Sequence, residues 1–126
     1  TSNYLIDAQI PTFQYELTYR GEHSFLVDDE GNKYGVTHAD DLIYLFPHMA
    51  GFPDLNEDDT KVSENIIRYW VNFAALGDPT PPSDEFSWTP MTSRNDRKYF
   101  NIKAEPAMEY SESHRQRMEL WSSILQ

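Results

Sequence analysis

The sequence predicts an α/β fold, and three observations support that class. Residues 12–19 alternate polar and apolar side chains with a period of two, which is typical of a strand. The segment from Asp58 to Gly77 instead carries apolar side chains at helical spacing. A short apolar segment at 98–102 predicts a second strand, and residues 111–125 predict a final helix.

The ends of these elements follow from local chemistry. Gly21 closes the first strand, and residues 22–37 form a loop with a turn at 29–32. Two acidic residues, Asp40 and Asp41, then begin a short helix that Pro47 ends, because negative charge favours a helix N-terminus. In the long helix, Gly77 stands at the C-cap and Pro79 blocks continuation.

The expected elements are too few for a complete sheet. One strong strand and one weak strand form at best a marginal pair in water, and the two amphipathic helices need a layer to pack on. Hydrophobic residues make up 39% of the 126 residues and aromatic residues 14%, which is ample for a folded core. We therefore expect residues 1–126 to be the terminal part of a larger α/β domain.

Composition excludes several classes of function. The formal net charge of −11 disfavours binding to nucleic acid, because an acidic surface repels phosphate. The chain has no Cys and no glycine-rich phosphate loop, and its four histidines show no zinc-like spacing, so neither a metal nor another cofactor is expected. No apolar segment is long enough to span a membrane.

One residue, His38, stands in a context suited to acid–base chemistry. It follows the predicted strand and loop and comes directly before a helix, where a side chain can project into a cleft. Histidine exchanges protons near neutral pH, as a general base must. However, the chain has no G-x-S-x-G motif to supply a nucleophile, and a single loop histidine is more often a surface or structural residue. The residues alone leave both interpretations open.

Four segments resemble one known family in order and spacing. They are "FQYELTYRG" (13–21), "GVTHADDLIYLF" (35–46), "IIRYWVNFAALGDPTP" (66–81), and a C-terminal set formed by Trp88, "YFNI" (99–102) and residues 117–121. Together they resemble the type-B carboxylesterase and cholinesterase family, and the wording around His38 is most similar to the insect carboxylesterases and juvenile hormone esterases.

The resemblance implies the C-terminal part of an α/β-hydrolase fold, with residues 1–126 as the C-terminal portion of a single domain. His38 matches the histidine of a Ser-Glu(Asp)-His triad. The serine, the acid and the oxyanion hole would belong to an N-terminal part of the same enzyme, which would be the partner of this chain. The implied function is hydrolysis of small-molecule carboxylic esters without a cofactor, in a secreted protein.

Neighbours of His38 each have two interpretations. Tyr34 and Thr37 could line the substrate pocket, although loop packing is favoured. Asp41 matches an acidic family position and could support the histidine loop, or could serve only as a helix N-terminal charge. Ala39 replaces the usual glycine of the family, so a positive φ there would be strained. The aromatic residues Trp70, Phe73 and Trp121 are expected in the core because of their helical spacing.

Two other classes of function compete with the esterase. One is a catalytically inactive relative of the family that serves in adhesion or binding, which the presence of a G-x-S-x-G motif upstream would exclude. The other is a free-standing binding module, which the shortage of strands disfavours.

Overall fold

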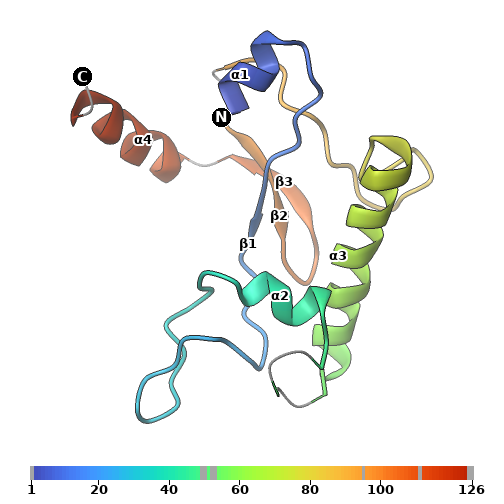
Figure 1. Cartoon of the computed structure of the whole chain (residues 1–126), viewed down its shortest axis with the longest axis vertical. Helices are drawn as coiled ribbons and strands as arrows, with labels where there is room; N and C mark the ends of the chain where they lie inside the picture. Colours follow the sequence, from blue (N-terminus) through green and yellow to red (C-terminus); the bar gives the residue numbers. More distant parts are fainter. Residues whose placement is uncertain (1, 49–50, 52–53, 95, 111, 125–126) are drawn as a thin grey trace.

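The computed structural model describes residues 2–48, 51, 54–94, 96–110 and 112–124. The elements in these ranges combine helices with one sheet (Figure 1). In chain order they are α1 (Ser2–Asp7), β1 (Tyr15–Leu17), α2 (Asp40–Leu45), α3 (Glu57–Leu76), β2 (Lys98–Ile102), β3 (Ala107–Tyr110) and α4 (Glu112–Ile124).

The sheet has the order β1-β2-β3. β1 runs parallel to β2 with Glu16 opposite Asn101, and α2 and α3 lie in the connection between them, as a parallel pair requires. β1 is shorter than the predicted strand 12–19, yet single hydrogen bonds extend the pairing at both ends, from Phe100 N–H to the Gln14 carbonyl (2.8 Å) and from Thr18 N–H to the Ile102 carbonyl (3.0 Å).

Two described elements were not predicted from the sequence. β3 pairs antiparallel with β2, and its four residues become a strand through that pairing rather than through propensity. α1 is a short helix at the start of the chain. The expectation of only two strands was therefore wrong, because the segment 107–110 is too short for its alternation to be recognised.

The long helix α3 has the ends that its sequence predicts. The Asn56 side chain accepts a hydrogen bond from Asp59 N–H (2.8 Å), which satisfies one of the free donors at the N-terminus. Gly77 adopts φ 72° and donates its N–H to the Phe73 carbonyl (2.8 Å). The prediction of Gly77 as the C-cap is confirmed.

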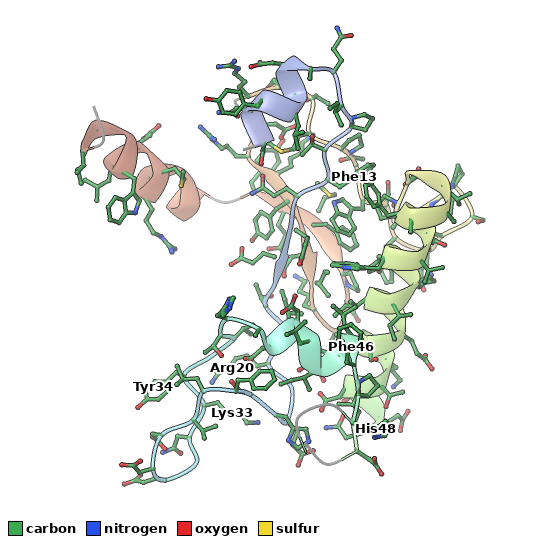
Figure 2. All side chains as sticks on the ribbon, in the orientation of Figure 1. Phe13, Arg20, Lys33, Tyr34, Phe46 and His48 are labelled. Atoms are coloured by element: carbon green, nitrogen blue, oxygen red, sulfur yellow. The ribbon has the colours of Figure 1, made fainter. Side chains whose placement is uncertain are left out.

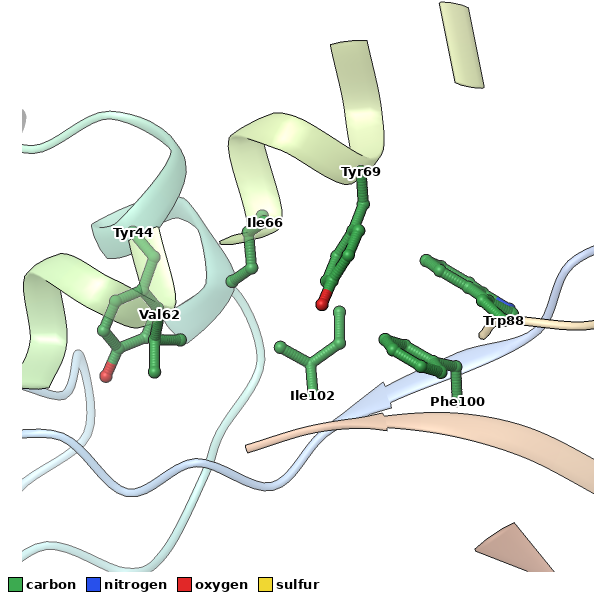
Figure 3. Packing of buried hydrophobic residues seen from close by; sticks show 7 residues of the cluster. All are labelled: Tyr44, Val62, Ile66, Tyr69, Trp88, Phe100 and Ile102. Carbon is green, nitrogen blue, oxygen red and sulfur yellow. The ribbon is translucent and has the colours of Figure 1, made fainter. Parts of the chain in front are cut away.

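The core lies between α3 and the sheet, with α2 at one end (Figure 3). The Trp88 indole stacks on the Phe100 ring at 4.8 Å and 6°, and Tyr69 of α3 meets both rings edge-on. Burial of these aromatic side chains helps to hold α3 on the sheet, because removing apolar area from water is favourable. The remaining members of the core cluster are Tyr44, Val62, Ile66 and Ile102.

Two aromatic residues expected in the core are exposed. Phe73 is 49% exposed and Trp121 is 56% exposed, whereas Trp70 is half-buried. Figure 1 shows the reason for Trp121, because α4 extends away from the sheet. The prediction was therefore wrong for these two residues in this chain. Leu125, also expected on the apolar stripe of the last helix, lies outside the described residues.

Candidate functional site

The candidate site lies in the connection between β1 and α2, residues 18–39. Its middle part folds on itself: Val27 and Lys33 form an isolated antiparallel bridge, and the Asp28 carboxylate accepts a hydrogen bond from Asn32 N–H (2.7 Å). The turn predicted at 29–32 is present one residue earlier, where Gly31 N–H donates to the Asp28 carbonyl (2.9 Å). His38 follows at the end of the connection, in the turn directly before α2, and its side chain is exposed.

The turn that carries His38 is closed by two hydrogen bonds. Asp40 N–H donates to the Thr37 carbonyl (3.2 Å), and Thr37 N–H donates to Asp40 Oδ2 (2.9 Å). The two residues on either side of His38 and Ala39 are therefore joined to each other. Such a reciprocal pair fixes the direction in which the chain enters the helix.

Ala39 holds an unusual backbone conformation within this turn. Its φ of 73° and ψ of 0° lie in the left-handed region, at values typical of the third residue of a type II turn. A residue with a Cβ is strained there by about 1–2 kcal/mol. The positive φ under which Ala39 is expected to be strained is therefore present.

Asp40 also ties the turn to a second segment of the connection. Its side chain is buried (4% exposed), and it accepts hydrogen bonds from Ser24 Oγ and from Phe25 N–H, both at 2.9 Å. With the bond from Thr37, one buried carboxylate thus holds residues 24–25 against residues 37–40. Burying a carboxylate is costly unless its oxygens accept hydrogen bonds, and both oxygens of Asp40 do so here.

The other predicted site residues lie around this turn without forming a single cluster. Tyr34 is 68% exposed on the outer part of the connection (Figure 2). The Thr37 hydroxyl lies 3.5 Å from Ser24 Oγ, so its side chain takes part in loop packing. Asp41 is half-buried, and after burial its charge is the second cause that raises the pKa of the Tyr15 phenol in β1.

The support that Asp40 and Ser24 give to the turn was not predicted from the sequence. A signal for Asp40 was present, since Thr37-x-x-Asp40 directly before an apolar run has the spacing of a capping box. No comparable signal marked Ser24, because its partner is 16 residues away.

Other kinds of site find no support in the described part of the chain. No group of three or more His, Asp or Glu side chains there is arranged to hold a metal ion. Within the same residues, no helix combines the length and the apolar character needed to cross a bilayer.

Comparison with known proteins identifies the relatives of this arrangement. The model of the carboxylesterase family matches residues 1–121. The chain belongs to the carboxylesterase family. Juvenile hormone esterase of Tribolium castaneum is 36% identical over 78 residues, which cover 56% of this chain and 13% of that protein. Glutactin of Drosophila melanogaster is 38% identical over 77 residues, covering 59% of this chain and 8% of that protein.

Solved structures confirm the α/β-hydrolase fold of this carboxylesterase segment. The carboxylesterase EST55 of Geobacillus stearothermophilus superposes with a TM-score of 0.67 at 18% identity, covering 94% of this chain and 23% of that protein. A PNB esterase gives a TM-score of 0.66 at 19% identity, covering 88% and 21% of the two chains. The chain thus spans less than a quarter of the length of these relatives.

Proposed function

We propose that this chain supplies the general base, His38, of a carboxylic ester hydrolase. The observation that carries the proposal is an exposed histidine in a turn that a buried carboxylate closes, in a chain of the carboxylesterase family. A residue that shuttles protons needs access to the reacting atoms and a fixed position. His38 has the first by its exposure and the second by its turn.

The proposed mechanism is acyl transfer in two steps. A serine hydroxyl attacks the ester carbonyl while His38 accepts its proton, and His38 then protonates the departing alcohol. Water enters, His38 accepts one of its protons, and the acyl-enzyme is hydrolysed to release the acid. A triad acid holds the imidazole of His38 in the required tautomer.

The serine, the triad acid and the oxyanion hole are proposed to lie in an N-terminal part of the same enzyme. In this proposal, residues 1–126 are the C-terminal portion of one α/β-hydrolase domain. Support comes from β1, which among the described strands pairs on one side only, and from the aromatic hollow beside it. Phe13, Tyr15, Trp70 and Phe73 line that hollow, and an apolar surface of this kind is suited to packing against another layer.

The substrate is proposed to be a small carboxylic ester, as the name of the Tribolium relative also suggests. Tyr34 is exposed and available to contact such a ligand, so we expect Tyr34→Ala to raise KM with little change in kcat. Thr37 and Asp41 are both half-buried. Substrate contact by Thr37 and support of the loop by Asp41 stay as predictions. The resemblance also favours secretion, which recovery of activity from the medium of expressing cells would test.

The decisive experiment replaces His38 in the full-length protein that contains these residues. We expect His38→Ala to lower kcat for p-nitrophenyl acetate by about 10⁴-fold or more, because loss of a triad histidine removes proton transfer from every step. Folding should be spared, since the side chain is exposed.

A matched control is available in the same region. His48 is also exposed and lies after α2, where Nδ1 is 3.3 Å from Asp54 Oδ1 (Figure 2). We expect His48→Ala to keep wild-type turnover. Full activity of the His38 variant would overturn the proposal, and failure of the wild-type protein to react with an organophosphate would favour the inactive, binding-only relative.

A further inference from the structure

The turn of His38 depends on one side chain that does not itself reach the reacting atoms. Asp40 lies two residues after His38, and its buried carboxylate accepts hydrogen bonds from the backbone N–H groups of Phe25 and Thr37. The donor Thr37 directly precedes His38. Loss of this acceptor would therefore release the residue next to the histidine.

The carboxylate satisfies donors from two segments that are distant in the sequence. Oδ2 accepts from Thr37 N–H and from Ser24 Oγ, while Oδ1 accepts from Phe25 N–H, all at 2.9 Å. Ser24 is itself buried, with 7% exposure. A smaller side chain at position 40 would leave the buried Ser24 hydroxyl and two partly buried backbone N–H groups without this acceptor, which proteins rarely tolerate without local rearrangement.

Strain in the turn makes this support necessary. Ala39 lies between His38 and Asp40 in the left-handed region, at φ 73°, where a residue with a Cβ does not stay by preference. Strained conformations of this kind persist only where surrounding contacts hold them. Three hydrogen bonds hold Ala39: the two between Thr37 and Asp40, of which one uses the Asp40 carboxylate, and one from Leu42 N–H to the Ala39 carbonyl (2.9 Å).

We infer that Asp40 is a positioning residue that fixes the orientation of His38, an inference that rests on the proposed role of His38 as general base. Asp40 acts by joining residues 24–25 to the turn 37–40, and it takes no part in proton transfer. The consequence is specific: loss of the carboxylate lowers the rate of the chemical step and leaves the binding of the ester unchanged. A displacement of about 1 Å in a catalytic group costs about 10²-fold in rate.

The test is a graded series of variants in the full-length protein, with p-nitrophenyl acetate as substrate. Asp40→Ala removes all three acceptor contacts, and we expect kcat to fall about 10²-fold with KM unchanged. Asp40→Asn keeps the shape but places an amide N–H₂ against one of the donors, so we expect an intermediate loss of about tenfold. Ser24→Ala removes one donor and leaves both backbone contacts, so its loss should be the smallest.

A second buried carboxylate provides the matched control. Asp59 is 1% exposed, lies in the first turn of α3, and accepts a hydrogen bond from Glu22 N–H rather than from the His38 turn. We expect Asp59→Asn to lower the melting temperature and to leave kcat per folded molecule unchanged. Thermal unfolding of every variant separates loss of folded protein from loss of rate, and if Asp40→Ala does not fold, Asp40→Asn decides the result.

The outcomes are distinguishable. Wild-type kcat in folded Asp40→Asn, or an equal fall in kcat for Asp40→Asn and Asp59→Asn, would overturn the role of Asp40 while leaving His38 as the base. A fully active His38→Ala variant would overturn the proposed function, and the role of Asp40 with it. A fall in kcat that is largest for Asp40→Ala, smallest for Ser24→Ala and absent for Asp59→Asn, at constant KM, supports the inference.

Discussion

Two buried aspartates hold opposite ends of the connection between β1 and α2, but their partners differ in kind. Asp40 accepts hydrogen bonds from backbone N–H groups and one serine hydroxyl, close to His38. Asp59 accepts a longer bond from Glu22 N–H (3.3 Å) and lies close to two tyrosines, Tyr19 and Tyr44, whose phenol pKa values its charge helps to raise. The donors around Asp40 are backbone amides and a hydroxyl, which stay neutral. The phenols near Asp59 ionise at alkaline pH.

This difference separates two tasks within one short connection. The Asp40 contacts fix the backbone geometry of a turn whose exposed tip carries the proposed base. The Asp59 contacts join the start of the connection to α3 and to the core through Tyr44. Changes near Asp59 should therefore appear in stability, and changes near Asp40 in rate, which the following substitutions test.

The largest effect on stability is expected at Gly21. A Cβ at this position would collide with the Tyr44 hydroxyl and come within 2.5 Å of Asp59 Oδ1. Because both atoms belong to buried side chains, neither can move freely, and we expect Gly21→Ala to lower the free energy of unfolding by about 1–3 kcal/mol. Thermal and denaturant unfolding measure this loss.

A second substitution shows whether the collision is the cause. Tyr44→Phe removes the hydroxyl that the new Cβ would meet first, so the double variant Gly21→Ala/Tyr44→Phe should recover part of the loss relative to Tyr44→Phe alone. Additive effects of the two substitutions would contradict this explanation. The kcat per folded molecule should be unchanged in all three variants, in contrast to the Asp40 series.

Much of this fold could be predicted from local patterns. The long helix was predictable because both its periodicity and its Gly77 cap are encoded within a few residues. β1 was predicted from the alternation over 12–19, although it is shorter than that range. β3 was not, because a strand of four residues exists only through its partner β2. The exposure of Phe73 and Trp121 was also unpredictable, since apolar spacing indicates a face to be covered but not whether this chain covers it.

The candidate site divides in the same way. His38 could be singled out from its sequence context, and its assignment as a triad member came from the resemblance. The Thr37–Asp40 pair was present in the sequence as a capping pattern, but its closure with Ser24 and Phe25 is a contact between distant segments. A contact of this kind leaves no periodicity or spacing to read, so the turn and its support had to come from the structure.

A smaller effect, of opposite sign, is expected on the Asp40 side. Ala39→Gly removes the Cβ that strains the left-handed conformation at φ 73°, so we expect the free energy of unfolding to rise by about 1 kcal/mol. Ala75→Gly is the matched control, because the same exchange at an exposed position within α3 should destabilise by about 0.5–1 kcal/mol. Equal losses in both variants would show that Ala39 is not strained.

The smallest effect on stability at neutral pH is expected for a substitution of Tyr19. The same substitution tests the difference between the two aspartates at alkaline pH. Burial, followed by the hydrogen bond and charge of Asp59, raises the pKa of Tyr19 to about 12 from an ordinary value of 10.0. Between these values the unfolded chain loses the phenol proton and the folded chain keeps it, so the stability that the neutral phenol contributes is complete below pH 10 and is lost as the pH rises towards 12. Tyr19→Phe should make the decline of stability in this range less steep, as followed by denaturant unfolding at a series of pH values. The change should be partial, because burial also raises the pKa of Tyr69 to about 12 and that of Tyr44.

The same pH series compares the two aspartates. Asp59→Asn should also make the alkaline decline of stability less steep, because it removes a charge that opposes ionisation of Tyr19. Asp40→Asn should change the decline less, because the charge of Asp40 is only the last cause of the pKa shift at Tyr44. An alkaline decline that depends equally on the two aspartates would show that they do not differ in the way their partners indicate.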